Sequence, residues 1–185
     1  MPETRADNVL MQKVRDGDLA KMAVLFERHH RALFRYFLRL TGNRELGEDL
    51  VQDVFFRMLK YRHTFQDGSA FTAWMYQVAR NAHLDGVRKA APEEPVEMYA
   101  EPRSPEPDPS EILRRRQDVK LLRRALAALP VEKREVLVLS RFQNLKYDQI
   151  AEILECDVGT VKVRVYRAIR ALSQIFFELA GEKAS

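Results

Sequence analysis

The sequence has little of several residue types, and each shortage excludes a class of protein. Cys156 is the single cysteine among 185 residues, which excludes an internal disulfide and a zinc site built from several cysteines. Only 7 residues are glycine, and strand-like alternation is scarce, so we expect a mostly helical chain. No apolar run reaches membrane-spanning length, and residues 1–7 lack a signal-peptide pattern. A soluble, cytoplasmic protein without a membrane partner is therefore predicted.

What is present supports a folded chain with an anionic partner. Hydrophobic residues make up 46% of the sequence, enough to bury a core. The formal net charge is +4, which favours but does not prove binding to an anion such as nucleic acid. Six of the 8 prolines fall in residues 92–111, together with seven acidic residues and one basic residue. This composition predicts a flexible linker, so the flanking parts are more basic than the total suggests. The acidic linker could also occupy a nucleic-acid channel.

The most informative stretch is 147–172, which predicts two helices joined by a short turn. Asp157 is well suited to cap the second helix, because its side-chain oxygen can accept from unpaired backbone amides. The apolar residues of the second helix share one face, being Val161, Val165, Ala168, Ile169 and Leu172. Cys156 in the turn is better suited to filling a small apolar space than to redox chemistry. A short helix, a tight turn and an amphipathic second helix predict a helix-turn-helix.

The opposite face of that second helix predicts DNA binding. It carries Thr160, Val163, Tyr166, Arg167 and Arg170, and Lys162 and Arg164 flank it. Arginine can contact guanine or phosphate, and a threonine at the helix start can reach a base edge. The alternative is an ordinary helical hairpin whose charges are merely solvated.

Two predicted helices before the linker carry further candidate surfaces. In the helix at 44–61, Asp49 and Asp53 lie one turn apart and Phe56 is outward, which suggests a docking surface. A solvated face is the alternative, and general acid-base catalysis lacks converging partners. In the helix at 70–89, basic and aromatic groups interleave, which suits single-stranded DNA. For Phe71 and Trp74 themselves we favour a place in the core.

The remaining segments complete an all-α prediction. We expect helices at 9–14, 19–40, 112–129 and 131–143. The inward stripe of the second of these is predicted to be Ala23, Phe26, His30, Leu33, Phe34, Phe37 and Leu40. His29 and His30 lack nearby ligands, so packing or surface roles are favoured over a metal site. The prediction is therefore two helical domains, at 1–91 and 112–185, joined by the flexible linker 92–111, without a cofactor or bound metal.

Three segments, taken in order, resemble bacterial RNA polymerase sigma factors of the extracytoplasmic-function group. Residues 48–55 (EDLVQDVF) resemble the family's segment for docking on core RNA polymerase. Residues 71–75 (FTAWM) with 79–81 (ARN) and 85–88 resemble its promoter-melting and minus-ten helix. Residues 126–130, 134–136, 147–151, 159–162, Arg164 and 167–168 resemble its minus-thirty-five domain. The likeness covers both predicted domains and misses only the termini and the linker.

The resemblance implies roles for matching positions. Polymerase docking would involve Asp49, Gln52, Asp53 and Phe56. Opened minus-ten DNA would lie along Arg80, Asn81, Asp85, Arg88 and Lys89. Duplex minus-thirty-five DNA would meet Thr160, Lys162, Val163, Arg164 and Arg167. Catalysis would belong to the polymerase, so the chain is not expected to be an enzyme. Many members of the family are held by an anti-sigma protein, which is a further potential partner.

Three positions depart from the family's usual pattern, and two rival functions stay open. Glu155 stands where the family often has glycine, and would be strained if φ is positive there. Val163 replaces a frequent serine, and Gly86 replaces a bulkier residue. The first rival is a stand-alone DNA-binding regulator, which leaves the acidic strip at Asp49 unexplained. The second is an enzyme using Asp49 with Asp53, or His29 with His30, although no nucleophile-base set or phosphate loop accompanies them.

Overall fold

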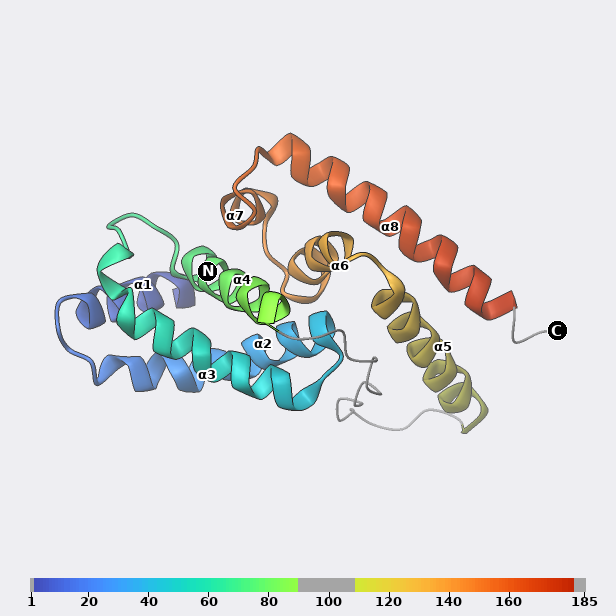
Figure 1. Cartoon of the computed structure of the whole chain (residues 1–185), viewed down its shortest axis with the longest axis horizontal. Helices are drawn as coiled ribbons and strands as arrows, with labels where there is room; N and C mark the ends of the chain where they lie inside the picture. The colour runs from blue at the N-terminus through green and yellow to red at the C-terminus, as the bar shows by residue number, and fades with distance from the viewer. Residues whose placement is uncertain (1, 90–108, 182–185) are drawn as a thin grey trace.

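The computed structural model describes residues 2–89 and 109–181, which are helical apart from the connecting turns. The first four α-helices gather at one end of the molecule and the last four at the other (Figure 1). The N-terminal set is α1 Pro2–Arg15, α2 Lys21–Thr41, α3 Arg44–Lys60 and α4 Phe71–Lys89, with a short 3-10 turn Arg62–Thr64. The C-terminal set is α5 Pro109–Ala128, α6 Val131–Leu137, α7 Tyr147–Ile153 and α8 Val158–Gly181. The predicted all-α class with two helical domains is confirmed.

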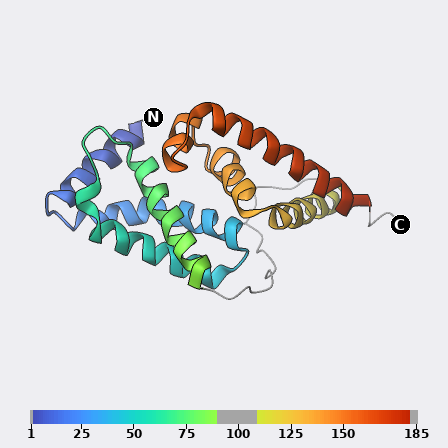
Figure 2. The ribbon, with the colours of Figure 1, turned by 45° about the horizontal axis from the view of Figure 1, so that its top comes forward.

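In the N-terminal domain, α2 and α3 pack side by side and α4 crosses them (Figures 1 and 2). Leu33, Phe37, Val54, Met58 and Phe71 are buried where these helices meet. The start of α3 is fixed by Asn43, whose side-chain oxygen accepts from the amide of Leu46 at 3.1 Å. Gly42 ends α2 with φ of 70°, a left-handed conformation that favours glycine. The prediction that Phe71 belongs to the core is confirmed, whereas Trp74 is half-buried and donates to the Thr64 hydroxyl.

The predicted inward stripe of α2 was wrong in its first half. Ala23 and Phe26 are exposed and His30 is half-buried, whereas Met22, Leu25 and Tyr36 are buried instead. Leu33, Phe37 and Leu40 are buried as predicted, and Phe34 is half-buried. The physical reason is that α2 packs against α1, α3 and helices of the C-terminal domain at once, so residues beside the predicted stripe are covered as well. Phe26 lies at the margin, stacked on His30 and edge-on to Phe55.

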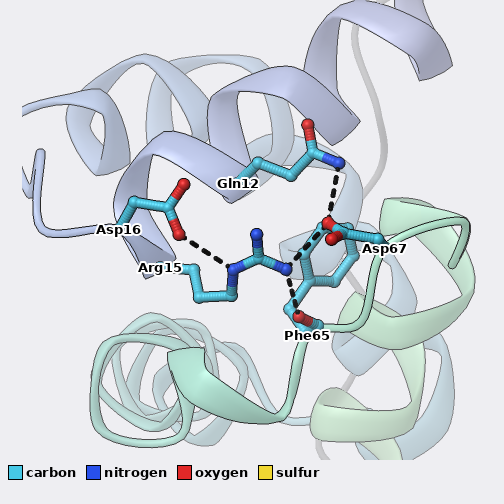
Figure 3. Close-up of polar contacts among 5 residues, drawn as sticks. All are labelled: Gln12, Arg15, Asp16, Phe65 and Asp67. Atoms are coloured by element: carbon cyan, nitrogen blue, oxygen red, sulfur yellow. Dashed lines mark hydrogen bonds and ion pairs between the residues drawn. The ribbon is translucent and has the colours of Figure 1, made fainter.

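A polar cluster fastens α1 to the loop that precedes α4. The Arg15 guanidinium donates to Asp67 Oδ1 at 2.8 Å and to the carbonyl of Phe65 at 3.2 Å (Figure 3). Gln12 donates to the same Asp67 oxygen at 3.1 Å, and Asp16 pairs with Arg15 from the other side (Figure 3). These bonds hold the pKa of the Asp67 carboxyl below its usual value, chiefly through the hydrogen bond from Arg15. The loop is thereby fixed at the point where α4 begins.

The C-terminal domain is built around α8, which runs along its outer side (Figures 1 and 2). Helices α5, α6 and α7 all pack against it. Helix α5 begins at Pro109, three residues before the predicted Ile112, so residues 109–111 belong to a helix and not to the linker. The rest of the predicted linker, 92–108, lies outside the described residues. The single predicted helix at 131–143 is an α-helix to Leu137 followed by a π-helical turn, Val138–Phe142.

Candidate functional site

The helix-turn-helix predicted at 147–172 is present as α7 and α8. Asp157 caps α8 as expected: its Oδ1 accepts from the amide of Thr160 at 2.8 Å. These bonds lower the pKa of the Asp157 carboxyl, and the largest contribution comes from the Thr160 hydroxyl, which donates to Oδ2 at 2.6 Å. Because this hydroxyl proton is already engaged, Thr160 can offer a base its oxygen lone pairs but not its proton. In the turn, Glu155 has φ of 50°, so the strained conformation considered for that position does occur.

The outer face of α8 is solvent-exposed along its first half. Val161, Val165 and Ala168 are buried against the domain. The opposite side presents exposed Lys162, Val163, Arg164, Tyr166, Arg167 and Arg170. These residues recur three or four positions apart, so they form one continuous basic strip on the surface of the helix. Such a strip can enter the major groove while the buried side holds the helix to its support.

The acidic strip on α3 is also exposed, but only in part. Asp49, Gln52 and Phe56 face solvent, and Phe56 keeps 65% of its surface accessible. An exposed aromatic side chain beside an acidic residue fits a contact surface better than a core role. Asp53 is half-buried and accepts from Arg57 Nε at 2.9 Å. The candidate docking surface therefore consists of free side chains at Asp49, Gln52 and Phe56 and of one ion-paired carboxylate.

Arg57 joins two of the predicted surfaces, although it was not among the predicted site residues. Its Nη1 donates to Asp85 Oδ2 at 2.6 Å while its Nε holds Asp53. Both bonds raise the pKa of Arg57, and the bond to Asp53 contributes the most. The bond between Asp53 and Arg57 could be predicted from their spacing of four residues on one helix. The bond between Arg57 and Asp85 on α4 could not, because no local pattern connects the two positions. Asp49, Asp53, Arg57 and Asp85 line a pocket of about 190 Å³ between α3 and α4.

The predicted minus-ten residues on α4 do not share one environment. Asn81 is exposed, Asp85 is bound to Arg57, and the side chains of Arg88 and Lys89 lie outside those described. Arg80 is half-buried and donates from Nε to Glu135 Oε2 at 3.3 Å. Gly86 has room for a larger residue, because an added Cβ would meet only Leu50 at 3.6 Å. Crowding therefore does not explain why glycine stands at position 86 in place of the bulkier residue that is common in the family.

Glu135, on α6, is a buried carboxylate; it lies in the segment 134–136 that resembles the family, but the resemblance implied no role for it. It is 6% exposed, accepts from the Tyr36 hydroxyl at 3.2 Å and binds Arg80. Burial raises the pKa of its carboxyl, and the Arg80 charge offsets part of that rise. Tyr36 is fully buried, and its burial, together with the nearby Glu135 charge, raises the pKa of its hydroxyl. No local pattern links positions 36, 80 and 135, so only the structure could bring them together.

The remaining candidates for chemistry have structural partners. His29 Nε2 lies 2.9 Å from Asp7 Oδ2, and Arg28 donates to the other oxygen of this buried carboxylate at 2.7 Å. His30 Nδ1 lies 2.8 Å from the carbonyl oxygen of Phe26. Across residues 2–89 and 109–181, no three His, Cys, Asp or Glu side chains gather closely enough to hold a metal ion. Each α-helix in the described ranges is too short or too polar to cross a membrane.

Comparison with known families gives two matches along the chain. The model for Sigma-70 region 2 matches residues 25–93, and the model for Sigma-70, region 4 matches residues 120–172. The ECF RNA polymerase sigma factor SigL of Mycobacterium tuberculosis is 34% identical over 164 residues, covering 88% of this chain and 93% of SigL. The ECF RNA polymerase sigma factor RpoE of Cereibacter sphaeroides is 32% identical over 168 residues, covering 89% of this chain and 92% of RpoE.

Solved structures share the fold. The structure of CnrH in complex with the cytosolic domain of CnrY has a TM-score of 0.71 at 22% identity and covers 94% of this chain and 98% of CnrH. The sigma factor RpoE in complex with the anti-sigma factor NepR from Bartonella quintana has a TM-score of 0.65 at 24% identity. That match covers 83% of this chain and 94% of RpoE.

Proposed function

Because the chain belongs to the extracytoplasmic-function family of RNA polymerase sigma factors, which direct promoter-specific transcription, we propose that its two helical domains divide promoter recognition between them. The domain at 1–91 docks on core RNA polymerase and holds the opened minus-ten strand. The domain that begins with α5 at Pro109 reads the minus-thirty-five element as duplex DNA. Residues 92–108 connect them. The chemistry of RNA synthesis belongs to the polymerase.

The observation that carries this proposal is that the two domains expose faces of opposite charge. On α8, cations cover the side opposite the buried Val161, Val165 and Ala168. On α3, exposed Asp49 lies beside Gln52 and the highly exposed Phe56. A basic helix suits the phosphates and base edges of DNA, whereas an acidic strip with an exposed aromatic repels DNA and suits a basic protein surface. A DNA-binding regulator acting alone has no use for the second face.

Within this division, the residues of α8 have distinct tasks. Arg164 and Arg167 are long enough to reach base edges or phosphates, and Val163 can contact a thymine methyl but cannot hydrogen bond. Lys162 binds phosphate, which contributes affinity without sequence choice and makes binding salt-dependent. Thr160, with its proton held by Asp157, acts as an acceptor. On the N-terminal domain, Arg80, Asn81, Asp85, Arg88 and Lys89 lie along the minus-ten strand.

We also propose a protein partner that controls whether this chain is available to core RNA polymerase. The RpoE structure similar to this chain is bound to an anti-sigma factor, and CnrH is bound to a cytosolic domain of CnrY. A protein of the anti-sigma type that binds this chain would compete with core RNA polymerase.

Capture of core RNA polymerase tests the docking surface. Asp49 is exposed on the acidic strip, so Asp49→Arg should sharply reduce the polymerase recovered with the tagged protein. Glu27→Arg makes the same change in net charge at an exposed position of α2, outside the strip, and should leave recovery unchanged. Equal recovery with wild type and both variants would refute the assignment of this face.

A further inference from the structure

The outward face of α8 is not uniformly basic, because two apolar side chains lie near its centre. In a helix with about 3.6 residues per turn, position 163 points almost directly away from the buried Val161 and Val165. Val163 keeps 47% of its surface accessible, and Tyr166, on the next turn of the same face, keeps 61%. Helix α8 lies along the outer edge of the molecule, and α5, α6 and α7 pack on its other side (Figures 1 and 2). Val163 and Tyr166, which we call the apolar pair, are therefore open to a partner outside the chain.

The surroundings of the apolar pair favour DNA as that partner. Residues 158–172 contain four basic residues and no acidic one. Lys162 and Arg167 are exposed on either side of the pair, and the Arg170 guanidinium lies 6.0 Å from the centre of the Tyr166 ring. In the major groove, base edges lie between two rows of phosphates. An apolar centre with cations on both sides matches that arrangement.

The side chains at the start of this face limit which base edge can lie against it. Thr160, one turn before Val163, donates its hydroxyl proton to Asp157 Oδ2 at 2.6 Å, so it cannot donate to a base. Val163 itself can neither donate nor accept. In the major groove, guanine presents acceptors and cytosine an amino group, whereas thymine presents its C5-methyl group, the one apolar group among the base edges. A favourable contact between Val163 and a base edge must therefore be with a thymine methyl group.

Tyr166 is placed to make a second contact of the same kind. Three residues advance a helix by about 4.5 Å, which is close to the rise of about 3.4 Å between base pairs. The ring of Tyr166 can thus lie against the base pair next to the one that faces Val163. An aromatic ring, like an isopropyl group, gains from burial against a methyl group and gains nothing from an unpaired amino group.

We infer that the apolar pair makes thymine methyl groups a requirement of the minus-thirty-five element: Val163 packs on one methyl group, and Tyr166 packs on that of a neighbouring base pair. This inference rests on the proposed reading of duplex DNA by α8. The cations on either side bind phosphate and guanine, whereas the apolar pair selects thymine. Cytosine at either position would place a polar amino group against an apolar side chain and cost it hydrogen bonds to water.

Deoxyuridine, which is thymidine without the C5-methyl group, isolates the contact. The probe is the duplex of a promoter found by mapping the start sites that core RNA polymerase uses with the full chain. Each thymine of its minus-thirty-five element is replaced singly by deoxyuridine, and fluorescence anisotropy measures binding of the polymerase assembled with the protein. Replacement of either thymine that faces the apolar pair should weaken binding about fourfold, which is the loss of one buried methyl-sized group at about 0.8 kcal/mol. Replacement of a thymine between the two promoter elements should have no effect.

Variants of the protein assign each methyl group to its side chain. Val163→Ala should abolish the effect of one deoxyuridine and keep that of the other, and Tyr166→Ala should do the reverse, because each truncation removes one partner of a contact. Tyr166→Phe keeps the ring and should keep both effects. Val131→Ala truncates an exposed valine of α6, which packs on the opposite side of α8, and should also keep both.

Three results would overturn the inference, and they leave different conclusions about the proposed function. If no single deoxyuridine changes binding while Arg167→Ala still weakens it, α8 reads DNA but not its methyl groups. If the deoxyuridine effects persist in Val163→Ala and Tyr166→Ala, other residues read the methyl groups. If Val163→Ala reduces capture of core RNA polymerase and deoxyuridine has no effect, the apolar pair is a protein contact. Absence of any promoter-specific initiation would refute the proposed function, and this inference with it.

Discussion

At the scale of single residues, Glu155 shows how a sequence departure becomes a measurable cost. Its φ of 50° lies in the left-handed region, which costs a residue with a Cβ about 1–2 kcal/mol. Asn144 has a similar φ of 53°, but asparagine tolerates this conformation because its side chain can bond locally. The two positions flank α7, so the domain holds one strained turn and one relaxed turn.

Glu155→Gly should therefore stabilise the protein. Relief of the left-handed strain outweighs the extra freedom that glycine gives the unfolded chain, leaving a gain of about 0.5–1 kcal/mol in the free energy of unfolding. Asn144→Gly is the matched control and should change it less. Urea unfolding followed by circular dichroism measures both. A loss of stability on Glu155→Gly would mean that the Glu155 side chain contributes more than its backbone costs.

Arg167 tests the base-reading role of α8 at the same scale. It is exposed on the basic strip, and Arg167→Ala should weaken binding to duplex minus-thirty-five DNA by about 1–3 kcal/mol if the side chain makes a bidentate contact with guanine. Arg124→Ala removes one exposed arginine from α5 and should have a much smaller effect. Fluorescence anisotropy at fixed salt makes the comparison. Equal affinities for the two variants would show that Arg167 does not read the bases of the minus-thirty-five element.

At the scale of elements, the patterns that predicted well were those with a local cause. The start of α3 and the start of α8 follow from Asn43 and Asp157, whose side chains accept from amides three residues on. The buried face of α2 could not be predicted in the same way, because α1 and α3 both pack on this helix. Hydrophobicity alone does not say which of two apolar sides is left exposed. The π-helical turn after α6 has no sequence signature of its own.

The cap of α8 gives a pH-dependent prediction. Hydrogen bonds from Thr160 lower the pKa of Asp157 in the folded state, so the charged cap stabilises the domain above the unfolded pKa. That contribution is lost as the pH falls through the lowered value. Asp157→Ala should lower the melting temperature at neutral pH. Asp157→Asn should lower it much less, because asparagine also caps helices.

The difference in melting temperature between Asp157→Asn and wild type provides the check. It should shift in favour of Asp157→Asn as the solution is acidified below the usual range of an aspartate, since asparagine does not titrate. Scanning calorimetry at several pH values measures the trend. A difference that stays constant with pH would show that the Asp157 charge has no part in holding α8.

At the scale of the whole molecule, the sequence predicted the modules but not their contact. Periodicity and capping identified two helical domains, and exposed residues of one charge marked two of the candidate surfaces. The bonds that join the domains connect positions 36, 80 and 135, or 76 and 143, and such distant pairs leave no pattern in one sequence. For this reason Arg80 was predicted as a free DNA contact, whereas in the structure it is bound to Glu135.

The contact between the two domains leaves both charged strips exposed. The acidic strip on α3 and the basic strip on α8 are both solvent-exposed, while the contact between domains is made by residues outside both. In the proposed function, docking on the polymerase and reading of duplex DNA can therefore begin without breaking that contact.

As a sigma factor, this chain should select where RNA polymerase begins transcription. The most direct test is to map the 5′ ends of RNA made by purified core RNA polymerase on a fragmented genomic template, with and without the protein. New start sites should appear in the presence of the protein, preceded by two shared sequence elements at fixed spacing, and they should be lost with Asp49→Arg. Identical start sites and yields whether or not the protein is added would contradict this prediction.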